Sequence, residues 1–216
     1  GLSFNSDGTK MFVTSNGGNS VYEFHLSTGF DIRTASDSGQ SYDFEAESID
    51  SPSGLRFNDD GTMMFVIDSD GEADANGDQI HQYSLSTGFD LSSTVTHLGS
   101  IDLTAKYQEI IGGSIFGELK YMEFNNDGSK LYTTWSRWEN DTGNKKQITR
   151  QRILQYSLDC PYGVVTCKNP VSGSDKDMIG VIESYTEMSK RVMKNNIKPV
   201  MHRLEWLRRH RKEDNL

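Results

Sequence analysis

The chain has 216 residues with 31 acidic and 22 basic side chains, which gives a formal net charge of -9. This acidic balance argues against a nucleic-acid partner, because the phosphate backbone is bound mainly through positive charge. Hydrophobic residues make up 34% of the chain, which suffices for a folded core. No run approaches the roughly 18 apolar residues of a membrane-spanning helix.

The charge is divided unevenly along the chain. Residues 1–173 carry a formal charge of -12, whereas residues 174–216 carry +3. The sequence NPVSGS at 169–174 separates the two parts and is typical of a linker. We therefore expect two regions, a body over 1–173 and a different C-terminal segment over 174–216.

The body contains three copies of one repeat. GLSFNSDGTKMFV, GLRFNDDGTMMFV and YMEFNNDGSKLYT align with one another, and each is followed by a second phrase, VYEFHLSTGFDIRT, IHQYSLSTGFDLSS or ILQYSLDCPYGVVT. The equivalent residues Phe4, Phe57 and Phe124 are 53 and 67 residues apart. This spacing is typical of a propeller blade with insertions.

Each repeat predicts a group of antiparallel strands. The Asp-Gly pairs at Asp7, Asp60 and Asp127 lie between short aromatic and branched runs, and Asp-Gly favours a tight hairpin turn. The phrase that begins at Val21 alternates with period two, as a third strand does. YDFEAESI and VTHLGSIDL are candidates for fourth strands. The predicted fold is all-β, a partial β-propeller of about three four-stranded blades at roughly 1–48, 49–115 and 116–170.

The repeat phrases resemble a known class. FNxDG[TS]K[ML][FY] is similar to the hairpin of bacterial propeller repeats of the TolB, YVTN and NHL kind, and its pairing with YxLSTxFD resembles repeats in large surface proteins of marine bacteria. The resemblance covers about 160 residues and implies the fold more than a function, because propellers host lyases, lactonases, adhesins and scaffolds. A closed propeller needs about four to eight blades. We therefore expect a fragment of a longer protein, or a partial propeller whose edge is covered.

The loop between the second and third strands of the second repeat is acidic. DSDGEADANGDQ places oxygen-bearing side chains at alternate positions, which suits a hard cation such as Ca²⁺. The bidentate Glu that completes an EF-hand is absent, so a solvated acidic loop is the alternative. The candidate ligands are Asp68, Asp70, Glu72, Asp74, Asn76 and Asp78.

The corresponding loop of the third repeat, WSRWENDTGNKKQITRQR, predicts one long hairpin with aromatic and positive side chains together. Trp135, Arg137 and Trp138 are the candidate binding residues, since exposed Trp and Arg are frequent in binding hot spots. The alternative is that both tryptophans pack on a neighbouring blade. The expected partner is a protein or a glycan.

The two cysteines, Cys160 and Cys167, bracket the turn of the third repeat. Six residues separate them, with Pro161 and Gly163 in the turn, which favours a disulfide and an oxidising compartment.

No catalytic motif is present. GGSIFG around Ser114 lacks the second glycine of a nucleophile elbow, and there is neither an HExxH motif nor a phosphate-binding loop. The inward positions Ser3, Arg56 and Glu123 do not repeat one ligand type, which favours a binding role. The alternative is a hydrolase resembling propeller lactonases, with a metal held between blades.

The C-terminal segment predicts an amphipathic α-helix. Met178, Ile182, Tyr185, Met188 and Val192 recur at helical spacing, and Pro199 should kink or divide the helix. The part from Val181 to Leu216 resembles the segment that joins passenger to translocator in some autotransporter proteins of marine bacteria. That resemblance implies a membrane β-barrel after the segment, and it is the one membrane connection we expect. The alternatives are a helix that docks on the propeller or a partner for a coiled coil.

Together these features predict a noncatalytic propeller module at the bacterial cell surface or outside the cell, with the periplasm as the less favoured location. It would bind its ligand through the face that carries the long loops.

Overall fold

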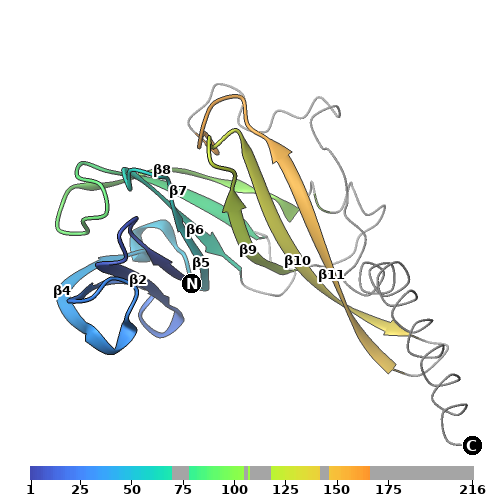
Figure 1. The fold of residues 1–216 in the computed structure, drawn as a ribbon. Coiled ribbons are helices and arrows are strands. Elements are labelled where there is room, and N and C mark those ends of the chain that lie inside the picture. Colours follow the sequence, from blue (N-terminus) through green and yellow to red (C-terminus); the bar gives the residue numbers. More distant parts are fainter. Residues whose placement is uncertain (70–77, 105–106, 108–117, 142–145, 166–216) are drawn as a thin grey trace, which may run out of the picture.

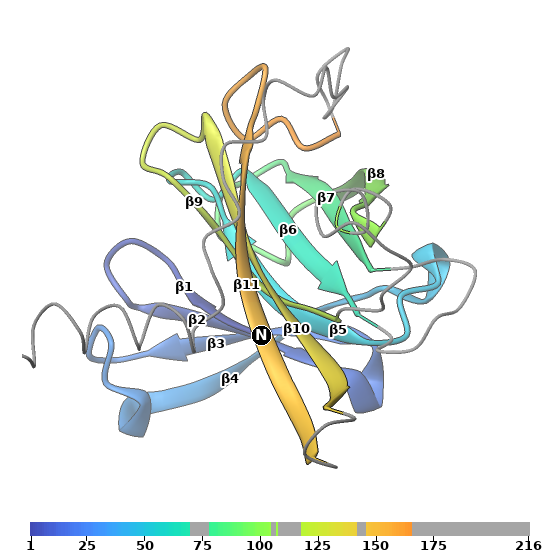
Figure 2. The same cartoon turned by 90° about the vertical axis from the view of Figure 1, so that its right-hand side faces the viewer.

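The computed structural model describes residues 1–69, 78–104, 107, 118–141 and 146–165. This part of the chain is all-β and forms three antiparallel sheets (Figures 1 and 2). The C-terminal segment 174–216, where the sequence predicts a helix, lies outside the described residues.

Each sheet is built from one repeat. The first contains β1 (Leu2–Phe4), β2 (Lys10–Ser15), β3 (Ser20–Leu26) and β4 (Ala35–Asp43) in that order. The second contains β5 (Pro52–Phe57), β6 (Met63–Asp68), β7 (Gln79–Leu85) and β8 (Val95–Asp102). In the third, β9 (Glu118–Phe124), β10 (Lys130–Asp141) and β11 (Lys146–Ser157) pair in sequence order. Three 3-10 turns lie at Asn16–Gly18, Ile32–Thr34 and Glu45–Glu47.

The strand assignments from sequence are largely confirmed. VTHLGSIDL contains β8, but YDFEAESI is not the fourth strand of the first repeat. There β4 ends at Asp43, and the chain continues into the 3-10 turn at Glu45–Glu47. The predicted long hairpin is present as β10 and β11, which pair over twelve positions and extend beyond the other strands in both views (Figures 1 and 2).

The sheets pack face to face through two apolar clusters, as consecutive blades of a β-propeller do. Successive side chains of a strand point to opposite faces. Accordingly Met64 and Val66 of β6 lie in the cluster shared with the first sheet, whereas Phe65 and Ile67 lie in the cluster shared with the third. A middle blade is buried on both faces, which explains the continuous apolar run of β6.

The phrase FNxDG[TS] builds the turn between the first two strands of every sheet. The amide oxygens of Asn5, Asn58 and Asn125 accept the N–H of the residue five positions later. The carboxylates of Asp7, Asp60 and Asp127 accept the N–H two positions later. The glycines that follow have φ between +67 and +73, as Asp-Gly predicts.

The STGF phrase completes the same turn. The aromatic residues Phe30, Phe89 and Tyr162 donate their N–H groups to the carbonyls of Gly8, Gly61 and Gly128 at 2.8–3.1 Å. Their rings lie directly over those glycines, where a Cβ atom would stand 2.2–2.4 Å from the ring. The two recurring phrases of each repeat therefore form one structural unit at one end of the sheet, which we call the turn face.

Candidate functional site

The innermost strands β1, β5 and β9 lie side by side, with β5 in contact with both of the others. In a propeller such strands line the central channel. Arg56 and Glu123, two of the three inward positions expected from the repeats, contact each other there.

Arg56 joins all three sheets near the turn face. Its Nε donates to Oε2 of Glu123 at 3.0 Å, and its Nη1 donates to the carbonyl of Leu2 at 3.1 Å. The guanidinium also lies 4.2 Å from the ring centroid of Tyr121. The Arg56 side chain is 15% exposed whereas that of Glu123 is 52% exposed. The carboxylate therefore remains open to solvent beside a fixed positive charge.

An open pocket of about 290 Å³ lies next to this group, between the first and second sheets. It takes residues from the turns of both sheets and has three aromatic rings, two hydroxyls, one amide and one carboxylate. They are Phe4, Phe57 and Phe89; Ser3 and Ser6; Asn58; and Asp59. Ser3 is the third inward position, so the pocket opens beside the channel.

The two sheet interfaces differ at one ring next to this pocket. Tyr162 occupies in the third repeat the place that Phe89 has in the second. Its hydroxyl donates to Oδ1 of Asp59 at 3.1 Å, which joins the turns of the second and third sheets. Burial, followed by this bond to Asp59, raises the pKa of Tyr162 to about 12. Phe89 has no hydroxyl that could form the corresponding bond to Ser6, the equivalent turn residue, and both residues line the pocket.

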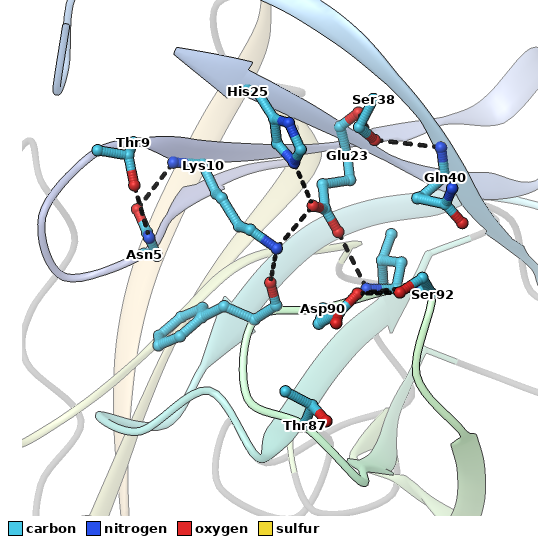
Figure 3. A network of polar contacts seen from close by, with 12 residues as sticks. Asn5, Thr9, Lys10, Glu23, His25, Ser38, Gln40, Thr87, Asp90 and Ser92 are labelled. Atoms are coloured by element: carbon cyan, nitrogen blue, oxygen red, sulfur yellow. Dashed lines mark hydrogen bonds and ion pairs between the residues drawn. The ribbon is translucent and has the colours of Figure 1, made fainter. Parts of the chain in front are cut away.

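A polar network centred on Glu23 and Lys10, shown in Figure 3, contacts the turn that carries Phe89. The Glu23 carboxylate is 1% exposed and accepts Lys10 Nζ at 2.8 Å and the N–H of Leu91 at 3.0 Å. It also contacts His25 Nε2 at 3.0 Å. Lys10 Nζ donates in addition to the carbonyl of Phe89 at 2.8 Å. Both groups therefore bind main-chain atoms of the next sheet, on either side of Asp90.

The candidate binding residues from the long hairpin have different outcomes. Trp135 is 1% exposed, stacks on Tyr107 with ring centroids 4.4 Å apart, and donates its Nε1–H to Thr133. It is a core residue, so the expectation that it forms an exposed platform is wrong. The alternation of β10 places Trp135 on the same buried face as Leu131 and Thr133, where it joins the apolar cluster shared with the second sheet. The backbones of Arg137 and Trp138 lie in β10 opposite Arg150 and Thr149, but their side chains are outside the described part.

The proposed calcium ligands are described only at the two ends of their loop. Asp68 Oδ1 accepts the N–H of Ser51 at 3.0 Å, and Asp78 Oδ2 accepts the N–H of Leu119 at 2.9 Å. Burial raises the pKa of Asp78 to about 6. Asp70, Glu72, Asp74 and Asn76 lie outside the described residues. Within the described ranges, no three His, Cys, Asp or Glu side chains lie close enough to hold a metal ion.

Cys160 lies in the turn after β11, and the described part of the chain contains no free cysteine. Cys167 is outside the described residues, so its pairing with Cys160 stays a prediction. Among the helices that the structure describes, none has the length and apolar character needed to cross a membrane.

The sequence signals for this site were incomplete. The inward positions were visible from the repeat alignment, but the pocket was not. The residues that line it come from two repeats, and the alignment does not show that these turns lie next to each other.

No protein-family model matches the chain, and no curated protein matches it in sequence. Several solved structures are similar to it, among them the following two. One is a protein from Lactobacillus plantarum, with 14% identity and a TM-score of 0.46 over 85% of this chain and 54% of that one. The other is the periplasmic gluconolactonase of Pseudomonas aeruginosa, with 11% identity and a TM-score of 0.42 over 85% and 52% of the two chains. The chain thus spans about half the length of each.

Proposed function

We propose that this chain is a noncatalytic propeller module that binds a short glycan in the pocket between its first two sheets. The observation that carries the proposal is the composition of that pocket. The rings of Phe4, Phe57 and Phe89 offer apolar surface for the C–H faces of sugar rings. Ser3, Ser6 and Asp59 supply hydroxyl and carboxylate groups for sugar hydroxyls.

Binding to a panel of immobilised glycans, followed by calorimetry with the best oligosaccharide, tests the proposal. Ser6→Trp should fill the pocket from its exposed rim and abolish binding. Asn126→Trp is the matched control, because Asn126 has the equivalent turn position in the third sheet and does not line the pocket. Equal loss of binding in both variants, or no glycan bound at millimolar concentration, would contradict the proposal.

The face with the long loops is a second proposed surface of the same module. It would bind a protein or a glycan through Arg137 and Trp138. Trp135 is buried and does not belong to this surface. Trp138→Ala should weaken such binding without lowering the unfolding midpoint, whereas Trp135→Ala should lower the midpoint because Trp135 is buried. A Trp138→Ala variant with full ligand affinity would exclude this surface.

We also propose that the loop 68–78 binds Ca²⁺. The oxygen-bearing side chains at alternate positions of this loop support the proposal, and Asp68 and Asp78 at its two ends accept main-chain N–H groups of Ser51 and Leu119. Titration of the chain with calcium by calorimetry is the test, and Asp74→Asn combined with Asn76→Ala is the variant. No heat at millimolar calcium would end this proposal.

The location remains a proposal as well. We propose secretion and display at the bacterial surface, with the segment 181–216 as a link toward a membrane barrel. The predicted Cys160–Cys167 disulfide supports an oxidising compartment. Alkylation of the native chain followed by mass spectrometry should find both thiols protected until a reductant is added.

The alternative function is that of a lactonase-like hydrolase with a metal held between blades. It requires metal ligands from more than one sheet, and the described residues supply no such group. Turnover of a panel of lactones, measured with and without added divalent cations, separates this alternative from a binding module.

A further inference from the structure

The two sheet interfaces repeat one docking pattern. At each interface we call the sheet that contributes its second and third strands the accepting sheet, and the sheet whose aromatic turn packs on them the docking sheet. On the accepting sheet, an aromatic residue of the second strand lies opposite a polar residue of the third. These pairs are Phe12 with Glu23 and Phe65 with Gln82. The polar member binds the main chain of the aromatic turn on the next sheet. Glu23 does so as described above, and Gln82 donates to the carbonyl of Tyr162 at 3.2 Å and accepts the N–H of Val165 at 2.9 Å.

The rings pack in the same way at both interfaces. Phe12 packs on Phe57 with centroids 4.7 Å apart, and Phe65 packs on Phe124 at 4.6 Å. On the docking sheet the inner aromatic residue packs in turn on the turn residue, at 5.2 Å in both cases.

The third sheet carries the accepting half of this pattern. Tyr132 lies opposite Gln155, in the register of the two earlier pairs, and Lys130 is equivalent to Lys10. Phe12, Phe65, Glu23 and Gln82 are at most 1% exposed, whereas Tyr132 and Gln155 are only half-buried. Gln155 forms no side-chain hydrogen bond with another described residue.

The first sheet carries the docking half. Phe4 packs on Phe30 with centroids 5.5 Å apart, which reproduces the inner-aromatic and turn-aromatic pair. Phe30 is 60% exposed and Ile32 is 64% exposed. Leu91 and Val164 are equivalent to Ile32 in the second and third repeats, and they are 6% and 0% exposed. The chain therefore has one accepting face and one docking face, and their side chains match.

We propose that the occupant of these faces is a second copy of this chain, bound head to tail at both ends. The Phe30 turn of one copy packs on Tyr132 of the other, and its main-chain carbonyl and the Ile32 N–H bond to Gln155. The contact is heterologous, so it either closes into a ring or extends into a filament. Two copies of three sheets give six, which is within the range of closed propellers, and the ring then covers the exposed faces of the first and third sheets.

Sedimentation velocity of the intact chain over a range of concentrations tests this assembly. The expected result is a species of twice the 24.3 kDa chain mass. Ile32→Asp should shift it to the monomer by placing a charge in the interface. Leu98→Asp is the control, because Leu98 is an exposed apolar residue of the outer strand β8 and belongs to neither face.

A mixing experiment distinguishes this arrangement from a symmetric dimer through one patch. Ile32→Asp damages the docking face and Gln155→Lys damages the accepting face, so each variant alone should be monomeric. Mixed together, they retain one intact interface between unlike copies and should form a heterodimer. A wild-type chain that stays monomeric at all concentrations, or a mixture that stays monomeric when each variant is folded, would overturn the proposal.

Discussion

Glu23 and Gln82 occupy equivalent positions of β3 and β7, and each binds the main chain of the aromatic turn that follows in the next sheet. They do so with different chemistry. The carboxylate of Glu23 can only accept, so Lys10 supplies the donor that reaches Phe89. The amide of Gln82 donates and accepts by itself, and Met63 takes the place of Lys10, with its Sδ 3.5 Å from Gln82 Nε2.

The first prediction concerns the replacement of the Lys10 and Glu23 pair by the methionine and glutamine found at the equivalent positions of the second repeat. Lys10→Met should destabilise the fold by about 3 kcal/mol or more, because it leaves a buried carboxylate without its main cation. Glu23→Gln should cost about 1–3 kcal/mol. The double variant reproduces the Met63 and Gln82 pair and should recover more than half of the summed loss. Urea unfolding of all four proteins measures this coupling, and purely additive losses would refute the equivalence.

The second prediction compares Gly61, in the Asp-Gly turn of the second sheet, with Gly39, which lies in β4. Gly61 and Gly39 both have φ of +73, but a Cβ at Gly61 would stand 2.2 Å from the ring of Phe89, whereas Gly39 has no neighbour within 4 Å. Gly39→Ala should therefore cost only the backbone strain, about 1 kcal/mol. Gly61→Ala should cost about 2 kcal/mol more, because the ring must move. Thermal or urea unfolding measures both, and equal losses would show that the aromatic cover is unimportant.

The third prediction separates Arg56 from its ion-pair partner. Arg56→Lys should cost about 1–2 kcal/mol, because lysine cannot reach the carbonyl of Leu2 and Glu123 together and stacks less well on Tyr121. Glu123→Gln should cost less than about 1 kcal/mol, since its carboxylate is half exposed. If urea unfolding finds the two losses equal, the ion pair rather than the main-chain contact holds the sheets together.

The fourth prediction is a pH dependence. His81 is buried, its Nε2 has no hydrogen-bond partner in the described part, and burial followed by the neighbouring His97 lowers its pKa to about 4. As the pH falls, the His81 imidazole therefore takes up a proton in the unfolded chain at a higher pH than in the folded chain. The stability that depends on neutral His81 is present above pH 6.5 and is lost as the pH falls toward 4.

His81→Leu places at this position the residue of the third repeat, Leu154, and removes the titrating group. Between pH 7 and pH 4 the wild-type chain should lose about 2–3 kcal/mol relative to this variant, because one pKa unit corresponds to about 1.4 kcal/mol. Urea midpoints at half-unit pH steps measure the difference. Parallel curves for the two proteins would show that His81 does not drive the acid sensitivity.

The sequence by itself determined the repeat, the turns and the strand order. Asn and Asp-Gly at fixed offsets specify a hairpin through local hydrogen bonds and positive φ, so Asp7, Asp60 and Asp127 predicted the same turn three times without knowledge of neighbours. The alternation of β3 and the length of the β10–β11 hairpin were likewise readable, because they depend on the period of a single chain segment.

Only the tertiary structure decided which side chains face another sheet. Trp135 and Trp138 look alike in the sequence, yet the alternation of β10 places Trp135 in the core against Tyr107. Glu23 reads as a polar strand residue until the turn of the next sheet brings the Leu91 N–H to it. The pocket is formed where Phe89 of the second sheet meets Ser6 of the first. Such contacts join residues about 70 to 100 positions apart, and their distance is set by how one sheet packs on the next rather than by any local pattern.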